Sequence, residues 1–181
     1  MLITSMSKKK LSISFEKKIV LITGASRGIG KNIANKFENL GAKTIRLNSS
    51  TYDLSNINEI KDCMNFIKSH KKIDILVNNA AINYSEKNIN FNDDKFDKLM
   101  SVNLKAPFMI TSSVSSLMKK NKYGRIINIS SIASTRVRES KTAYSASKFA
   151  INGFTQSLAK ELGKKGIRVN AICPVLIKTD G

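Results

Sequence analysis

Short runs rich in β-branched residues alternate with longer stretches whose apolar residues recur at helical spacing, and this alternation constrains the fold of the chain most strongly. The helical spacing is clear in Ile29, Ile33 and Phe37, and it returns in later segments. Strands that are apolar on both faces and separated by helices predict a parallel sheet with helices on both faces. The strand candidates are the runs 18–23, 43–47, 51–54, 73–78, 125–130 and 167–173.

These elements predict one doubly wound α/β domain over residues 15–181, preceded by an N-terminal extension at 1–14. A chain of 181 residues has room for one domain with a sizeable core and not for two. No helix fits between residues 47 and 53, so we expect a tight loop between the second and third strands. The chain stops a few residues after the sixth strand candidate, which would leave that strand with an open edge.

The net charge of +18 comes from 31 basic and 13 acidic residues. The charge is spread along the chain, and its longest basic run is Lys8 to Lys10. A solvated, lysine-rich surface therefore explains it better than a nucleic-acid site, and we expect no nucleic-acid partner. A weaker alternative is that the positive field attracts anionic ligands such as phosphates, or an acidic carrier protein.

Several protein classes are excluded by residues that are absent or isolated. The longest aliphatic run, 19–22, is far too short to span a bilayer, and residues 1–14 lack the apolar core of a secretory signal. Cys63 and Cys173 stand alone, which excludes a zinc ribbon, and we expect no metal site. His70 is the only histidine and lies at an apparent helix end, which argues against a Ser-His-Asp mechanism. We expect a cytoplasmic protein without a membrane partner.

A glycine-rich turn lies between the first strand candidate and the first helix candidate. Gly24 permits the sharp turn, Gly28 lets the backbone approach a pyrophosphate, and Gly30 lets the helix pack closely on the strand. The N-terminal N–H groups of the following helix would bind the anion. This placement predicts a dinucleotide-binding site.

The end of the second strand bears on the choice of cofactor. A carboxylate there would bind the ribose hydroxyls of NAD and repel a 2′-phosphate. This chain has Asn48, Ser49 and Ser50 at that position, with Arg27 inside the glycine-rich turn. A cation and hydroxyls without a carboxylate favour NADP(H) over NAD(H), the alternative being that Arg27 is only solvent-exposed.

Three side chains form a candidate catalytic group. Tyr144 and Lys148 are four residues apart on one predicted helix and hence share a face. A free tyrosine titrates near about 10, and a neighbouring ammonium favours the phenolate, which suits acid–base chemistry. Ser131 follows the strand 125–130 at the carboxyl end of the sheet, where its hydroxyl could bind a substrate carbonyl, although it could equally cap a loop.

Asn103 is a fourth candidate because of its distance from Pro107. Proline has no N–H, so the carbonyl four residues earlier lacks its helical partner. The freed carbonyl of Asn103 could hold an ordered water in a proton relay toward Lys148. The alternative is a simple helix kink.

Taken together, these motifs resemble the short-chain dehydrogenase/reductase family, and within it the 3-oxoacyl-[acyl-carrier-protein] reductase-like members. The fold of that family is a Rossmann-like doubly wound sheet, and the resemblance runs from about residue 15 to residue 180. The residues that carry it are 23–30 (TGASRGIG), Asp53 and Leu54, 78–81 (NNAA), Asn103, Ser131, 144–148 (YSASK) and 174–179.

The resemblance implies a role for each matching residue in reducing a carbonyl to an alcohol with hydride from NADPH. Tyr144 would be the general acid and Ser131 would orient the carbonyl. Lys148 would bind the nicotinamide ribose and pass on protons from a water held by Asn103. Asp53 and Leu54 would form the adenine pocket. The implied cofactor-binding residues are Gly24, Ser26, Arg27, Gly28, Ile29, Gly30, Asn48, Ser49, Asp53, Leu54, Asn79, Ala80, Tyr144, Lys148, Pro174, Ile177 and Thr179.

The chain departs from the family pattern in four places. Ala81 and Val175 replace usual glycines, and the helix between the second and third strands is missing. Members of the family also continue for several dozen residues past this point, with a substrate lid and a last strand that pairs with its neighbour and mediates subunit contact. We therefore expect a domain truncated before the lid, and a homo-oligomer only where the full family interface is present.

The substrate and the activity are left open by these departures. The expected substrate is a 3-oxoacyl thioester or a related ketone, and the segment 135–141 with Arg136 and Arg138 could meet an anionic carrier or phosphate. A sugar-specific or small-ketone reductase is one alternative. Another is a non-catalytic NADP-binding or partner-binding remnant.

Overall fold

The structure, a computed structural model, describes residues 13–85 and 92–179. Its strands form one parallel sheet in the order β2-β1-β3-β4-β5. Within the described part of the chain they are β1 (Ile19–Thr23), β2 (Lys43–Leu47), β3 (Ile75–Asn78), β4 (Gly124–Ile129) and β5 (Ile167–Ile172). Residues 1–12 of the expected N-terminal extension and residues 180–181 of the expected domain lie outside the described residues.

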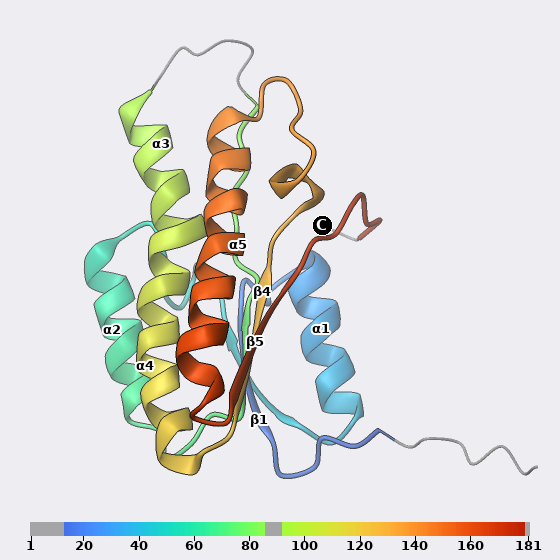
Figure 1. Ribbon diagram of the computed structural model, residues 1–181, viewed down its shortest axis with the longest axis vertical. Helices are drawn as coiled ribbons and strands as arrows, with labels where there is room; N and C mark the ends of the chain where they lie inside the picture. The colour runs from blue at the N-terminus through green and yellow to red at the C-terminus, as the bar shows by residue number, and fades with distance from the viewer. Residues whose placement is uncertain (1–12, 86–91, 180–181) are drawn as a thin grey trace, which may run out of the picture.

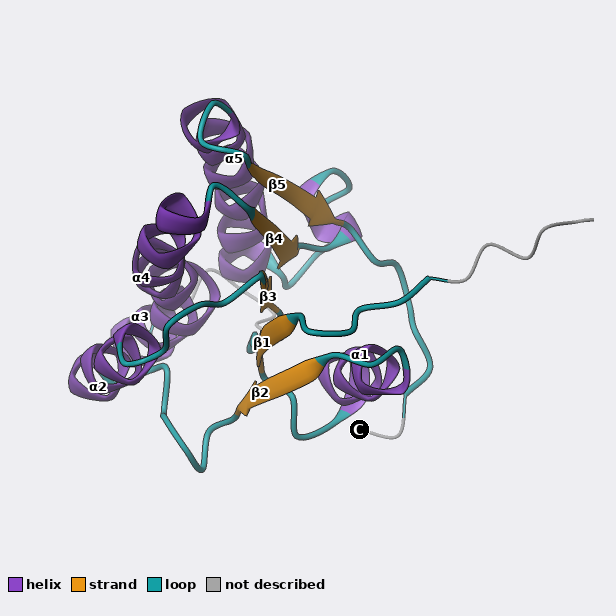
Figure 2. Cartoon of the chain, turned by 90° about the horizontal axis from the view of Figure 1, so that it is seen from below, coloured by secondary structure: helices purple, strands orange, loops and turns teal. Residues whose placement is uncertain are grey.

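Helices cover both faces of this sheet, as Figure 2 shows from one end of the strands. α1 lies on one face, and α2, α4 and α5 lie on the other. The predicted doubly wound α/β architecture is therefore confirmed. The helices are α1 (Gly28–Asn39), α2 (Ile57–Lys68), α3 (Asp93–Met100), α4 (Ala106–Asn121) and α5 (Thr142–Gly163), with a π-helical turn η1 (Ser101–Lys105) and a 3-10 turn η2 (Ile132–Ser134).

The strand expected at 51–54 is wrong, because this segment forms turns that lead directly into α2. Asp53 accepts hydrogen bonds from both the backbone N–H and the hydroxyl of Ser55, at 2.9 and 2.8 Å, which closes a turn instead of extending the chain. The side chain of Asn56 then caps α2 by accepting from the N–H of Asn58. The expected tight connection between the second and third strands is therefore wrong. α2 links β2 to β3, so the helix expected to be missing is present. The strand expected as the sixth is β5.

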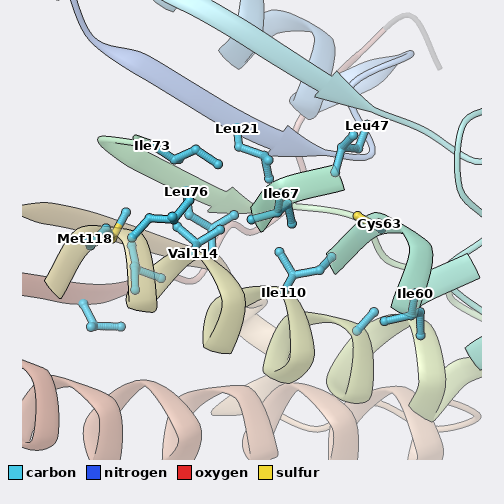
Figure 3. Packing of buried hydrophobic residues seen from close by; sticks show 14 of the residues in the cluster. Leu21, Leu47, Ile60, Cys63, Ile67, Ile73, Leu76, Ile110, Val114 and Met118 are labelled. Carbon is cyan, nitrogen blue, oxygen red and sulfur yellow. The ribbon is translucent and has the colours of Figure 1, made fainter. Parts of the chain in front are cut away.

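Two apolar clusters hold the helices on the sheet because neighbouring side chains of a strand point to opposite faces. Leu21 belongs to the cluster under α2 and α4, whereas Val20 and Ile22 belong to the cluster on the α1 face. Figure 3 shows the larger cluster, which includes Cys63. This cysteine is fully buried, and its burial raises the pKa of the thiol to about 11, so it packs as an apolar residue.

Part of the positive charge lies at the helix ends. Lysines occupy the last turns of the helices, where they offset the negative end of the helix dipole. Examples are Lys36 in α1, Lys68 in α2, and Lys119 and Lys120 in α4. Within the described part of the chain, none of the helices combines the length and the apolar character needed to cross a membrane.

The parallel strands bring their carboxyl ends to one edge of the sheet. The loops that follow β4 and β5 lie at the same end of the molecule as the first turn of α1 (Figure 1). The glycine-rich turn, the residues after β3 and the turn η2 also follow strand ends. The sequence candidates from distant parts of the chain therefore share this edge.

Candidate active site

The glycine-rich turn leads from β1 into α1 with a backbone that needs glycine. Gly24 and Gly28 have φ angles of +65° and +54°. A Cβ atom at Gly24 would lie 2.8 Å from the Cα of Ala80, and one at Gly30 would overlap the carbonyl of Gly24 and the amide of Asn79. These close approaches pack the turn against the end of β3 and form a backbone cradle at the N-terminus of α1. The first N–H groups of a helix have no partner within the helix and suit a phosphate.

Asn79 and Thr23 hold the end of β3 against this turn. The side-chain amide of Asn79 donates to the carbonyls of Thr23 and Gly24, at 2.9 and 3.0 Å. The hydroxyl of Thr23 accepts from the N–H groups of Asn79 and Ala80, both at 3.0 Å. Thr23 therefore helps to build the cradle, a role that sequence reasoning did not give it.

A cleft of 510 Å³ opens beside the cradle. The predicted cofactor residues that line it are Gly24, Ser26, Arg27, Gly28, Ile29, Gly30, Asn48, Ser49, Asp53, Leu54, Asn79, Ala80 and Thr179. The lining residues that sequence reasoning missed are Leu47, Tyr52, Ala81, Ile82, Lys98 and Val102. Of these, Leu47, Tyr52 and Ala81 are neighbours of predicted residues, whereas Lys98 comes from α3 and carried no motif.

The side chains of Asn48 and Asp53 shape the cleft at the end of β2. Asn48 Oδ1 accepts from the N–H and the hydroxyl of Ser50, which folds the turn after the strand. The hydrogen bonds from Ser55, with a smaller contribution from the charge of Lys98, lower the pKa of the Asp53 carboxyl from its ordinary value. The cleft therefore has an ionised carboxylate near Lys98 and no carboxylate at Asn48.

Tyr144 and Lys148 lie together on α5, outside the lining of the cleft. The Lys148 Nζ is 5.6 Å from the centre of the Tyr144 ring. Lys148 is only 2% exposed, and its ammonium donates to the carbonyl of Ile129 at 2.9 Å. Burial lowers the pKa of Lys148 to about 8, with a smaller opposing effect from Cys173.

Ser131 lies at the start of η2, directly beyond β4. Its hydroxyl oxygen accepts from the N–H of Ala133 at 3.1 Å, so it caps the turn, as the alternative reading anticipated. The carbonyl of Pro174 accepts from the N–H of Ile132 at 2.9 Å, which holds the segment after β5 beside Ser131. That segment leads to Thr179 in the cleft lining, whereas Pro174 and Ile177 are not among the lining residues.

Asn103 lies in the π-helical turn η1, which replaces the simple kink considered as the alternative. Pro107 sits in the first turn of α4, just after η1. The side chain of Asn103, 1% exposed, accepts from the N–H of Ile82 at 2.8 Å and donates to the carbonyl of Ile82 at 2.9 Å. It also donates to the hydroxyl of Ser147 at 3.1 Å. Sequence reasoning considered only the carbonyl of Asn103 and missed this side-chain role.

Val175 does not carry the strain that a glycine position suggests. Among the described residues, the non-glycine residues with positive φ are Lys17, Lys122 and Ser140, so the backbone at Val175 suits a branched side chain.

The described residues contain no group of three or more His, Cys, Asp or Glu side chains that could hold a metal ion.

Comparison with known proteins decides the family. The profile of the family described as short chain dehydrogenase matches residues 45–181. The 3-oxoacyl-[acyl-carrier-protein] reductase of Rickettsia felis is 38% identical over 183 residues, which cover 93% of this chain and 76% of that protein. The enzyme of the same name from Salmonella typhimurium is 35% identical over 187 residues, covering 93% and 77%. The chain belongs to the short-chain dehydrogenase/reductase family.

Solved structures of the family agree with this assignment. The 3-ketoacyl-(acyl-carrier-protein) reductase of Brucella melitensis, complexed with NADH, has a TM-score of 0.86 at 28% identity, covering 92% of this chain and 79% of that one. A metagenomic short-chain oxidoreductase in complex with NADP has a TM-score of 0.81 at 31% identity, covering 92% and 84%. This short-chain dehydrogenase/reductase is thus an NAD(P)-dependent oxidoreductase, most similar to the 3-oxoacyl-[acyl-carrier-protein] reductases, and the resemblance noted in its motifs is confirmed.

Proposed function

We propose that this short-chain dehydrogenase/reductase reduces the ketone of a 3-oxoacyl thioester to an alcohol with NADPH. The observation that carries the proposal is the pairing of Tyr144 and the buried Lys148 on one face of α5, at the same edge of the sheet as the glycine cradle. The cradle fits a dinucleotide because Gly24, Gly28 and Gly30 line the cleft at the N-terminus of α1, where backbone N–H groups suit a phosphate. When bound, the nicotinamide supplies the hydride.

Three side chains would carry out the proton chemistry. Ser131 already accepts a hydrogen bond at its oxygen, so its own proton can be donated to the substrate carbonyl and orient it. Tyr144 then donates its phenolic proton to the oxygen that develops negative charge. The ammonium of Lys148, 5.6 Å from the centre of the ring, would stabilise the phenolate left behind. Reprotonation through a water at the Asn103 carbonyl stays part of this proposal.

The preference for NADPH rests on charge. Arg27 and Ser49 line the cleft, and Asn48 at the end of β2 provides an amide where a carboxylate would repel a 2′-phosphate. Lys98, on α3, adds a second cation to the lining of the same cleft. These groups favour the cofactor with the additional phosphate.

A 3-oxoacyl group on an acyl-carrier protein is the substrate class that the relatives favour, since the Rickettsia and Salmonella enzymes are named for it. Two exposed arginines, Arg136 and Arg138, lie between η2 and α5, close in sequence to Ser131 and Tyr144. The ammonium of Lys141 donates to the side-chain oxygen of Asn83 at 3.0 Å, which links this loop to the segment after β3. The loop therefore offers positive charge to an anionic carrier.

Titration of the purified chain with NADPH and NADH, followed by nicotinamide fluorescence, tests the cofactor. Oxidation of NADPH by acetoacetyl-coenzyme A, by small ketones and by ketosugars then tests the reaction. We expect saturable binding that favours NADPH, and turnover that is fastest with the thioester. Binding without turnover on any ketone would instead support the non-catalytic alternative, and turnover with a ketosugar alone would reassign the substrate.

A further inference from the structure

A continuous chain of hydrogen bonds leads from the wall of the nucleotide cleft to the backbone of Tyr144. Ile82 lines the cleft, and the side chain of Asn103 binds both its N–H and its carbonyl. The same amide donates to the hydroxyl of Ser147 at 3.1 Å. The hydroxyl of Ser147 in turn donates to the carbonyl of Tyr144 at 2.7 Å. Three elements, the segment after β3, η1 and α5, are joined through two side chains.

Both side chains are buried, and both amide protons of Asn103 and the hydroxyl proton of Ser147 are used in hydrogen bonds. Ser147 is fully buried and Asn103 is 1% exposed, so water does not compete for these bonds. One amide proton of Asn103 goes to Ile82 and the other to Ser147. Removal of the Ser147 hydroxyl would leave a buried donor on Asn103 without its partner.

Ser147 differs in this respect from Ser115 in α4. Ser115 in α4 also donates to the carbonyl three residues earlier, that of Ser112, at 3.0 Å, and it too is buried. Its hydroxyl makes this bond within its own helix. Ser147 makes the same local bond and in addition accepts a bond from another element. The local bond alone is therefore an ordinary helical feature, and the bond from Asn103 is what needs an explanation.

We infer that Ser147 is a positioning residue that couples the wall of the nucleotide cleft, through Asn103 and Ile82, to the placement of Tyr144. The inference rests on the proposed function. A nucleotide that packs against Ile82 restrains Asn103, and the restraint reaches the first turn of α5 through the Ser147 hydroxyl. The phenol is then held at a fixed position relative to Lys148 and the substrate, on which the rate of proton transfer depends steeply.

The test compares Ser147→Ala with Ser147→Thr, which keeps the hydroxyl, and with Ser115→Ala, which removes the matched bond in α4. Alanine is smaller and a good helix former, so the first variant is expected to fold, and thermal melting checks this. The readouts on the full chain are kcat and KM with acetoacetyl-coenzyme A, the pH profile of kcat, and hydrogen exchange of the segment 142–148 with and without NADPH.

We expect Ser147→Ala to lower kcat about 10- to 100-fold, to change the KM for NADPH little, and to flatten or displace the pH profile of kcat. NADPH should protect 142–148 from exchange in the original chain and in Ser115→Ala, but much less in Ser147→Ala. Ser147→Thr should recover most of both effects. Unchanged kcat and unchanged protection in Ser147→Ala, or equal losses in Ser115→Ala, would overturn the inference.

The exchange measurement separates this inference from the proposed function. If the original chain binds NADPH without reducing any ketone, the proposed reaction is wrong, yet the loss of NADPH-dependent protection in Ser147→Ala would still support the coupling. If NADPH gives no protection at 142–148 in the original chain, the coupling itself is wrong, whatever the turnover.

Discussion

The ammonium of Lys148 donates a 2.9 Å hydrogen bond to the backbone carbonyl of Ile129, the last residue of β4. This contact fixes α5 against the strand end that leads into Ser131. The lysine is buried, and none of the described carboxylates is its hydrogen-bond partner. Its pKa falls to about 8 because the charged form is poorly solvated. Lys148, proposed above to stabilise the phenolate of Tyr144, thus destabilises the fold at neutral pH.

The substitution Lys148→Met is therefore expected to stabilise the protein while it abolishes turnover. Below pH 8 the ammonium is charged in both the folded and unfolded states, and the folded state bears the cost of burying it. The pKa difference corresponds to about 3 kcal/mol, reduced by about 1 kcal/mol for the lost bond to Ile129. We expect a gain of about 2 kcal/mol at pH 7 in urea unfolding.

The same substitution gives a pH dependence of defined sign. Between pH 8 and the ordinary lysine value of 10.5, the unfolded chain keeps the proton that the folded chain has released. The contribution of Lys148 to stability therefore rises with pH in this window. The advantage of Lys148→Met should shrink from pH 7 to pH 9.5. An advantage that stays constant, or a variant that is less stable at pH 7, would contradict the assigned cause.

Tyr144→Phe is expected to abolish ketone-dependent oxidation of NADPH without weakening cofactor binding. The phenolic hydroxyl is the proposed proton donor, and loss of a general acid lowers kcat by about 10²- to 10⁴-fold. The ring and its contact with Lys148 are kept, so the site should hold its shape. Steady-state turnover and NADPH fluorescence titration measure the two quantities. Full turnover in the phenylalanine variant would rule out the mechanism.

Gly30→Ala and Gly153→Ala form a matched pair of substitutions in helices. A Cβ at Gly30 would overlap the carbonyl of Gly24 and the amide of Asn79. A Cβ at Gly153 in α5 would have no described neighbour within 4 Å outside its own helix backbone. We expect Gly30→Ala to destabilise the fold by about 1–3 kcal/mol and to lose NADPH binding, because the cradle must shift. Gly153→Ala should stabilise by about 0.5–1 kcal/mol and bind NADPH normally. Thermal melting and fluorescence titration check both.

Residues with a local signature were predictable from the sequence. The glycines predicted a phosphate-binding turn because they lie between a β-branched run and an amphipathic helix. The spacing of four residues between Tyr144 and Lys148 predicted that they share a helix face. The strand prediction at 51–54 was wrong because a short residue pattern does not report the turn that Asp53 and Ser55 close. Lys98 in the cleft and the side-chain bonds of Asn103 come from tertiary contacts between distant elements, which no local pattern reports.

Asn48→Asp is a nearly isosteric change at a residue that bears on cofactor choice. Asn48 Oδ1 accepts the bonds that fold the turn after β2, and Asn48→Asp keeps this oxygen while adding a negative charge to the cleft lining. We expect NADPH to bind at least about tenfold more weakly, with NADH unaffected or improved, because only NADPH brings a 2′-phosphate to this charge. Arg27→Ala should weaken NADPH more than NADH through loss of the opposite charge. Titration of both variants with both cofactors provides the measurement. Equal losses for the two cofactors would mean that these residues shape the turn without reading the phosphate, and the preference for NADPH would then have to come from elsewhere in the cleft.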